Sequence, residues 1–232
     1  MQLESHIKWS AVDENWKTRR AGWVTELNGI VQAPVAEKNN PKPETGTYKS
    51  VVIGRQTWMT ENLDVDKFRN GDPIPQAKTE EEWKAAKENK QPAWWYCGKD
   101  SGNAAKYGKL YNWYAVSDPR GLAPAGWRIP TDDDWAGIYM QLRLVNATVS
   151  VLKSTSGWVD DKNGTNETGF NAYPGGDSYE WRCYNSGKEA SWWSSTDYTT
   201  QLIRVWAISK YDMFVMNGSF KYSGNSVRCI RE

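Results

Sequence analysis

The chain has 232 residues, a formal net charge of +1 and 25% charged residues. This near-neutral balance gives no electrostatic basis for binding nucleic acid or an anionic membrane. The mean hydropathy is −0.78, and no apolar run reaches the ~20 residues that a membrane helix needs, so we expect no membrane span. The opening residues MQLESHIKWS lack the basic and apolar regions of a signal peptide. Either a leader has been removed or the protein does not use one.

Residues 1–35 predict a separate arm. Trp9, Trp16, Trp23 and Ile30 recur at a spacing of seven, which is typical of a helix that oligomerises or docks on a partner. The alternative is a strand-and-turn segment packed on the main domain. A polar, Pro-rich connector, 36–46, follows, so the predicted division is an arm and linker over 1–46 and one domain over 47–232.

The domain opens with a predicted hairpin that turns at Gly54–Arg55. The first predicted helix runs from Thr79 to Lys90, because Thr79 and Glu82 form a capping-box pattern. Residues 93–98 predict a short buried strand, and 108–116 form a second apolar run.

The second predicted helix follows Thr131, with three aspartates at the positive end of its dipole. Its expected buried stripe consists of Trp135, Ile138, Tyr139 and Leu142. Loops rich in Gly, Asn and Thr fill 152–176. Strands and helices in this order indicate an α+β fold.

The C-terminal stretch 191–232 predicts two strands, at 202–209 and 212–216, with turns at 217–218 and 223–225. Side chains alternate along a strand. If Val205 faces inward, Arg204 and Trp206 therefore face outward. Of the adjacent pair Trp192 and Trp193, a strand should bury only one.

We predict an aromatic and polar ligand-binding face at this end of the chain, since Trp, Tyr and Arg often carry binding energy. Burial of the tryptophans in the core is the competing interpretation. The predicted ligand contacts are Trp193, Asp197, Tyr198, Arg204, Trp206, Tyr211, Asp212, Asn217 and Tyr222.

The residues give little support to an enzyme. The single histidine, His6, lies in the arm, so the main domain lacks a Ser-His-Asp or Cys-His arrangement. Cys97, Cys183 and Cys229 show no metal-ligand spacing. They allow one disulfide or three buried thiols, and Arg182 beside Cys183 could lower the pKa of a free thiol there. We predict no enzymatic activity and no cofactor.

One loop offers weak candidates for a calcium site. Asp160, Asp161, Asn163 and Glu167 lie close together in DDKNGTNETG and present several oxygen ligands. The spacing is not that of an EF-hand, and Asn and Asp in such loops commonly bond their own backbone.

Several strings, in order, resemble the Fibrobacter succinogenes major paralogous domain. They are VVIGRQTWMTENL, FRNGDPIP, PAWWYC, YGKLYNWYAV, DPRGLAPAGWRIPTDDDW, LKSTSGW, GTNETGFNAYPGG, WWSST and SVRCIRE. The resemblance covers about 47–232. It implies a C-type-lectin-like fold of the formylglycine-generating-enzyme type, with paired terminal strands, two helices and a loop-rich half that carries function.

The resemblance also implies a surface or secreted binding module, and some similar domains are variable proteins of diversity-generating retroelements. Ala123 stands where some members have Cys, which leaves Cys229 free or paired with Cys183 or Cys97.

We therefore predict a non-enzymatic, adhesin-like or receptor-like domain that binds a protein or glycan of a cell surface. The alternative is a structural or assembly subunit of a surface fibre or phage tail, held by the arm. The expected location is a cell surface, the extracellular medium or a virion.

Overall fold

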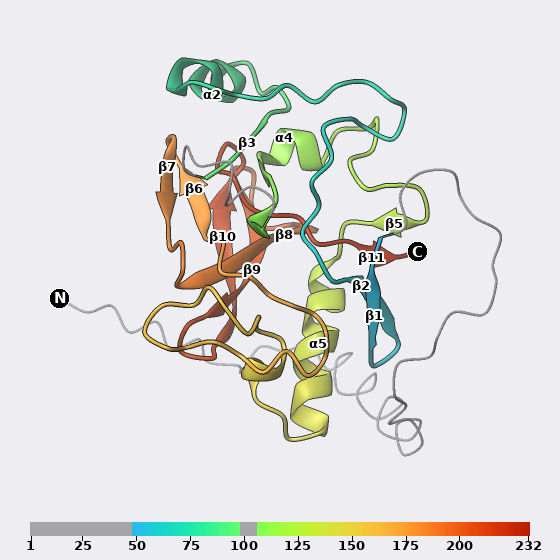
Figure 1. The fold of residues 1–232 in the computed structure, drawn as a ribbon. Helices are drawn as coiled ribbons and strands as arrows, with labels where there is room; N and C mark the ends of the chain where they lie inside the picture. Colours follow the sequence, from blue (N-terminus) through green and yellow to red (C-terminus); the bar gives the residue numbers. More distant parts are fainter. Residues whose placement is uncertain (1–47, 98–105) are drawn as a thin grey trace. The chain divides into compact units, whose positions relative to one another are not determined.

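A computed structural model describes residues 48–97 and 106–232 (Figure 1). The predicted arm, with its Trp9, Trp16, Trp23 and Ile30, lies outside the described residues. Helices and several small antiparallel sheets alternate along the chain, which confirms the α+β class. Within the described ranges, every helix is too short or too polar to cross a lipid bilayer.

The helical elements are α2 (Glu80–Glu88), α4 (Trp113–Val116), α5 (Asp132–Leu144) and a 3₁₀ turn, η1 (Val149–Val151). The strands are β1 (Ser50–Ile53), β2 (Gln56–Met59), β3 (Trp94–Trp95), β4 (Leu110–Tyr111), β5 (Trp127–Arg128), β6 (Asp177–Tyr179), β7 (Arg182–Tyr184), β8 (Glu189–Asp197), β9 (Leu202–Ser209), β10 (Phe214–Phe220) and β11 (Ile230–Arg231).

The first and last strands of the domain lie in one sheet. Its order is β1-β2-β11-β5, and Ile230 on β11 pairs with Trp58 on β2. Figure 1 shows the blue β1–β2 hairpin beside the red β11. The predicted opening hairpin is confirmed, and the C-terminal strand closes the domain against it.

A second sheet has the order β10-β9-β8 and carries the C-terminal stretch. The central strand β9 covers the predicted residues, but β10 begins and ends later than predicted. Asn217 and Gly218, predicted as turn residues, lie inside β10. Asp212, predicted as strand, lies in the preceding turn with φ of 56°.

This sheet lies between two apolar cores. Ile203 and Val205 of β9 belong to one cluster, together with Trp113 and Trp127. Trp206 and Ile208 of the same strand belong to another cluster, which includes residues of α5. Side-chain alternation is as predicted, but both faces of β9 are covered.

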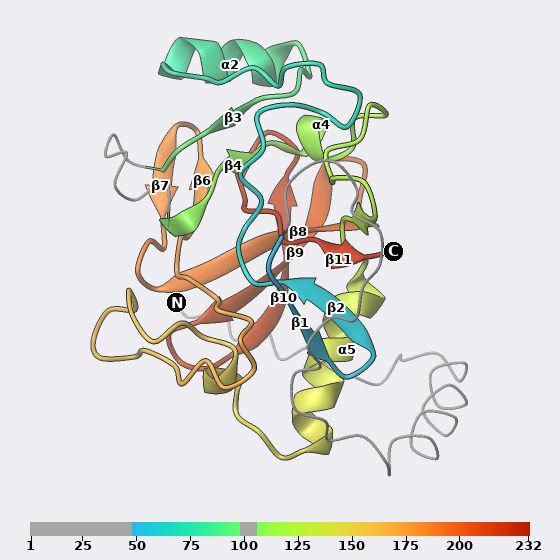
Figure 2. The same cartoon turned by 45° about the vertical axis from the view of Figure 1, so that its right-hand side comes forward.

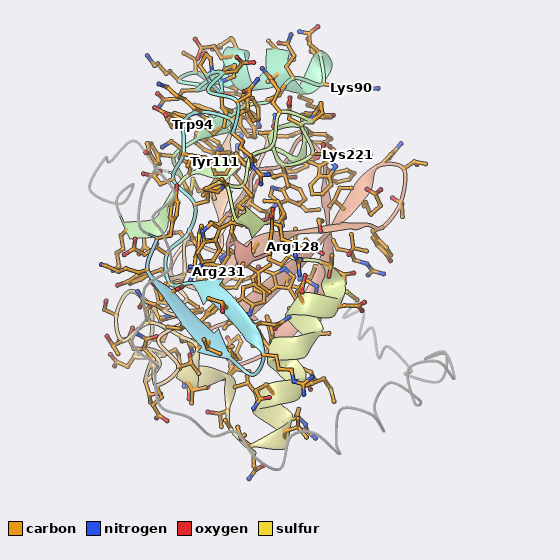
Figure 3. The ribbon with its side chains drawn as sticks, turned by 90° about the vertical axis from the view of Figure 1, so that its right-hand side faces the viewer. Lys90, Trp94, Tyr111, Arg128, Lys221 and Arg231 are labelled. Carbon is orange, nitrogen blue, oxygen red and sulfur yellow. A yellow bond between two sulfur atoms is a disulfide. The ribbon has the colours of Figure 1, made fainter. Side chains whose placement is uncertain are left out.

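Both long helices begin where capping chemistry predicts. Thr79 caps α2 and Thr131 caps α5, each with a complete capping box. The Arg128 guanidinium Nη2 lies 2.8 Å from Asp134 Oδ1 at the start of α5 (Figure 3). Tyr139, placed in the buried stripe by prediction, is 37% exposed and packs on Phe214 from the edge of α5.

The predicted apolar run 108–116 is only partly strand. It forms β4 and then, after the cap Asn112, the short helix α4. Trp94 of β3 pairs with Tyr111 of β4, and both are labelled in Figure 3. The hairpin β6–β7 lies beside β3 and β4 (Figure 2), and the predicted loop region 152–176 contains no helix or strand.

Candidate functional site

The two adjacent tryptophans of β8 are both buried, which corrects the prediction that only one would be. Trp193 is 0% exposed and packs in the cluster with Trp113. Trp192 is also 0% exposed and stacks on Trp135 of α5. A strand between two cores buries both of its faces, so Trp193 is a core residue and does not contribute to an exposed ligand face.

Trp206 is also a core residue. It is 9% exposed, packs on Phe214 at a ring-centroid distance of 5.2 Å and donates its indole N–H to Asp132 Oδ1 at 2.9 Å. The Nε of Arg204 lies 3.5 Å from the same carboxylate, and its guanidinium carbon lies 3.7 Å from the centre of the Tyr198 ring. The predicted outward face of β9 is thus mostly covered by the start of α5.

Asp212 has a structural partner. Its carboxylate accepts a hydrogen bond of 2.8 Å from the Lys153 ammonium, whose side chain is 1% exposed. The neighbouring Tyr211 is 70% exposed, and Asp197 is exposed at the end of β8. These predicted contacts are therefore distributed over the surface and do not form one concave site.

The candidate calcium loop uses its side chains internally. Asp160 binds the Lys210 ammonium at 2.5 Å, which lowers the pKa of Asp160. Asn163 Oδ1 accepts the backbone N–H of Trp158 at 3.0 Å. No group of three or more His, Cys, Asp or Glu side chains suited to a metal ion occurs within 48–97 and 106–232, so Asp161 and Glu167 do not complete such a group.

A polar pocket of about 370 Å³ lies on the other face of the β10-β9-β8 sheet. We call it the sheet pocket. Its lining residues come from β6, β8, β9, β10 and the loops that follow β7 and β10. They are Asp177, Asn185, Glu189, Ser191, Val205, Asn217, Gly218, Ser219 and Asn225.

Strand alternation explains why these residues converge. Glu189 and Ser191 share one face of β8, because they are two residues apart. Val205 pairs with Asn217 across β9 and β10. The opposite face of these strands carries Trp192 and Trp206, so the same alternation that buries those indoles directs polar side chains into the pocket.

Asn225 fixes the floor of the sheet pocket. It is 1% exposed. Its Oδ1 accepts a hydrogen bond of 2.9 Å from the Ser191 hydroxyl, and its Nδ2 donates one of 3.1 Å to Ser219 Oγ. Its backbone pairs with Tyr111 of β4 in both directions. These bonds join β4, β8, β10 and the final loop, so the floor is held in place before any ligand arrives.

The β6–β7 hairpin forms one wall. A disulfide from Cys183 on β7 to Cys97 holds it beside β3, and Trp181 in its turn stacks on Trp95 at 4.1 Å. Cys183 therefore belongs to the one disulfide that the cysteine count allowed, and it is not a free thiol, buried or reactive. Cys229 is free and buried, and burial raises its pKa to about 12, which makes it a poor nucleophile.

Two carboxylates lie in the pocket. Burial raises the pKa of Glu189 to about 7, and the negative charge of Asp177 makes a smaller contribution in the same direction. Burial also raises the pKa of Asp177, while the amide of Asn185 partly opposes that shift through a 3.3 Å hydrogen bond. Near neutral pH the two groups therefore form a partly ionised pair in a polar concavity.

An aromatic cluster includes residues that neighbour the pocket lining along the chain. Phe220 and Tyr222 stack at 5.2 Å, and Tyr179 contacts both rings. Tyr179 follows Asp177 by two residues on the same face of β6, and Phe220 directly follows Ser219. The Lys87 ammonium lies 4.0 Å from the centre of the Tyr222 ring.

Of the nine predicted contacts, Asn217 lines the sheet pocket, and Tyr222 belongs to the aromatic cluster with Phe220. The sequence-based prediction missed Asp177, Glu189 and Asn225. A usable signal was present, because Gly176 and Gly224, each next to a pocket residue, allow close backbone approach. A Cβ on Gly176 would collide with the Tyr184 carbonyl, so glycine there lets the start of β6 approach the end of β7 closely.

A family model described as the Fibrobacter succinogenes major domain matches residues 51–231. This range contains the β10-β9-β8 sheet, the sheet pocket and all but the first residue of the β1-β2-β11-β5 sheet. No curated protein and no solved structure matches the chain significantly.

Proposed function

The chain belongs to the Fibrobacter succinogenes major domain family, and from this premise we propose that it is a non-enzymatic binding domain whose ligand is a glycan of a cell surface. The sheet pocket is the proposed binding site. It replaces the broad aromatic face predicted from the sequence, since Trp193 and Trp206 are buried.

We also propose that the fold is C-type-lectin-like, of the formylglycine-generating-enzyme type. Pairing of β2 with the C-terminal strand β11 supports this assignment, as does the loop region that precedes β6. In this arrangement the pocket lies over the C-terminal strands, where the family resemblance led us to expect ligand binding.

The observation that carries the proposal is the composition of the pocket. Hydroxyl, amide and carboxylate groups line it, and Val205 is the one apolar side chain among the residues that do. Binding pockets for small ligands range from about 300 to 1,000 Å³. A concave polar site of this size suits a sugar residue better than a flat protein surface.

A glycan array tests the proposal. The wild-type chain should bind a subset of glycans, and Asn217→Ala should reduce that binding at least tenfold, since it removes a side chain that lines the pocket. The control Asp197→Ala changes an exposed residue of the same sheet outside the pocket. Loss of binding in the control but not in Asn217→Ala would place the site on the predicted outer face instead.

A second function, glycoside hydrolysis, is favoured by one observation. A carboxyl group with a pKa near 7 beside a second carboxylate has the properties of a general acid and its partner. The appearance of new reducing ends on the bound glycans measures hydrolysis. Release that disappears in Glu189→Gln would replace the binding proposal with a catalytic one.

A further inference from the structure

The sheet pocket carries negative charge without a positive counterpart. Asp177 and Glu189 line it, and its lining contains no lysine or arginine. Among the residues that the structure describes, neither carboxylate forms an ion pair with a basic side chain. The hydrogen bond that Asp177 accepts comes from the neutral amide of Asn185.

Such an arrangement costs the folded protein free energy. Partial burial disfavours the ionised form of a carboxylate, and two carboxylates at one site disfavour ionisation of each other. Both effects raise the pKa of Glu189 to about 7. A positively charged group placed between the two carboxylates would offset this cost, whereas a neutral ligand would not.

The remaining lining shows what else the ligand carries. Ser191, Ser219 and Asn225 form a connected polar floor, and Asn217 adds an amide at the rim. Hydroxyl groups of a ligand can bond to such groups as donors and as acceptors. An alkyl amine or a lysine side chain needs an apolar channel for its stem, which Val205 alone does not provide.

We infer that the sheet pocket takes a sugar residue with a free, protonated amino group, held between Asp177 and Glu189 and bonded through its hydroxyls to the polar floor. This inference rests on the proposed glycan-binding function and specifies the class of sugar. The N-acetylated form of the same sugar lacks the charge and should bind more weakly.

Calorimetry with three oligosaccharides of equal length provides the test. The probes are a glucosamine tetramer with free amines, its fully N-acetylated counterpart, and a neutral glucose tetramer of the same linkage. The wild-type chain should prefer the free-amine tetramer by tenfold or more, because a hydrogen bond to a charged group contributes more than one to a neutral group. The preference should fall as salt is added.

Asp177→Asn and Glu189→Gln should each remove most of the preference for the free-amine tetramer over the neutral tetramer. Glu88→Gln is the matched control, because it removes one negative charge at an exposed position of α2. Preference that survives both pocket substitutions, or disappears equally in the control, would show that the amine is not bound by these carboxylates. Circular dichroism melting confirms that each variant is folded.

The outcomes separate the two proposals. Equal affinity for the three tetramers, with loss of all binding in Asn217→Ala, overturns the amino-sugar inference and retains glycan binding. Absence of binding to the free-amine tetramer also overturns the inference. If the glycan array is negative as well, the proposed function is overturned with it.

Discussion

At the scale of single residues, the tryptophans show how composition alone can mislead. The chain has 15 Trp, a number that suggests a recognition surface. Trp58, Trp135, Trp192 and Trp193 are among the largest fully buried side chains. Three of these indoles, those of Trp58, Trp192 and Trp193, donate their N–H groups to internal acceptors, as Trp193 does to the Tyr111 carbonyl at 2.8 Å. The N–H of Trp135 has no partner within the described part of the chain. A polar handle therefore does not require exposure.

Trp206→Ala should therefore lower the free energy of unfolding by about 3–5 kcal/mol, because it leaves a cavity beside Phe214 and an unpaired Asp132 oxygen. Tyr211→Ala, at a position that is 70% exposed, should change it by less than about 0.5 kcal/mol. Urea denaturation of both variants measures the difference. Equal, small effects would show that Trp206 is not part of the core.

Glu189 should make stability depend on pH. Its ordinary pKa of 4.5 is raised to about 7 in the folded state, so between these values the folded state binds the proton more tightly than the unfolded chain. This contribution is fully present below about pH 4.5 and is lost as the pH rises through about 7. The charged group facing it is Asp177 of β6, whose raised pKa acts in the same direction, and the remaining pocket side chains are uncharged.

Glu189→Gln should remove this loss and stabilise the protein above neutral pH by on the order of 1 kcal/mol, a figure reduced for solvent screening of a half-buried group. Denaturation curves for the variant and the wild type across this pH range provide the comparison. Identical pH profiles would mean that Glu189 titrates at its ordinary pKa in the folded protein.

At the scale of elements, the β6–β7 hairpin depends on contacts with other parts of the chain. Each strand has three residues, too few for an isolated hairpin to be stable. The disulfide Cys97–Cys183 closes a loop across 86 positions, and the Trp181–Trp95 stack adds a second attachment. The wall of the sheet pocket is thus positioned by β3, which is distant in sequence.

Cys183→Ser should lower the free energy of unfolding by about 2–4 kcal/mol, the usual effect of removing a native disulfide. It should also weaken glycan binding, because Asp177 lies on the released hairpin. Dithiothreitol should reproduce both effects in the wild type and add nothing in the variant. A wild-type protein whose unfolding and binding are unaffected by the reductant would contradict a role for this disulfide.

At the scale of the whole molecule, strands from the two ends of the described domain meet. Pairing of β11 with β2 and β5 brings Arg228 into the interior, where it is 0% exposed. Its guanidinium donates to the carbonyls of Met59 at 3.0 Å and Phe170 at 2.6 Å. One buried cation therefore joins the opening hairpin, the long loop region and the C-terminus, a connection that the string SVRCIRE does not reveal.

The sequence by itself determined the features that depend on neighbours along the chain. Thr79 with Glu82, and Thr131 with the aspartates after it, specify the starts of α2 and α5, because a capping box forms within four residues. The turn at Gly54–Arg55 and the span of β9 follow from equally local patterns, and the family resemblance follows from strings in order along the chain.

Only the tertiary structure decided which face of the C-terminal sheet carries a pocket. Alternation assigns Val205 and Trp206 to opposite faces, but it does not state that α5 covers the side of Trp206. Nor does it bring Asp177, Glu189, Asn217 and Asn225 to one pocket. These residues converge because strands far apart in sequence pair with one another. Burial of a sheet face against another element is likewise a property of the assembled domain and not of a local sequence pattern.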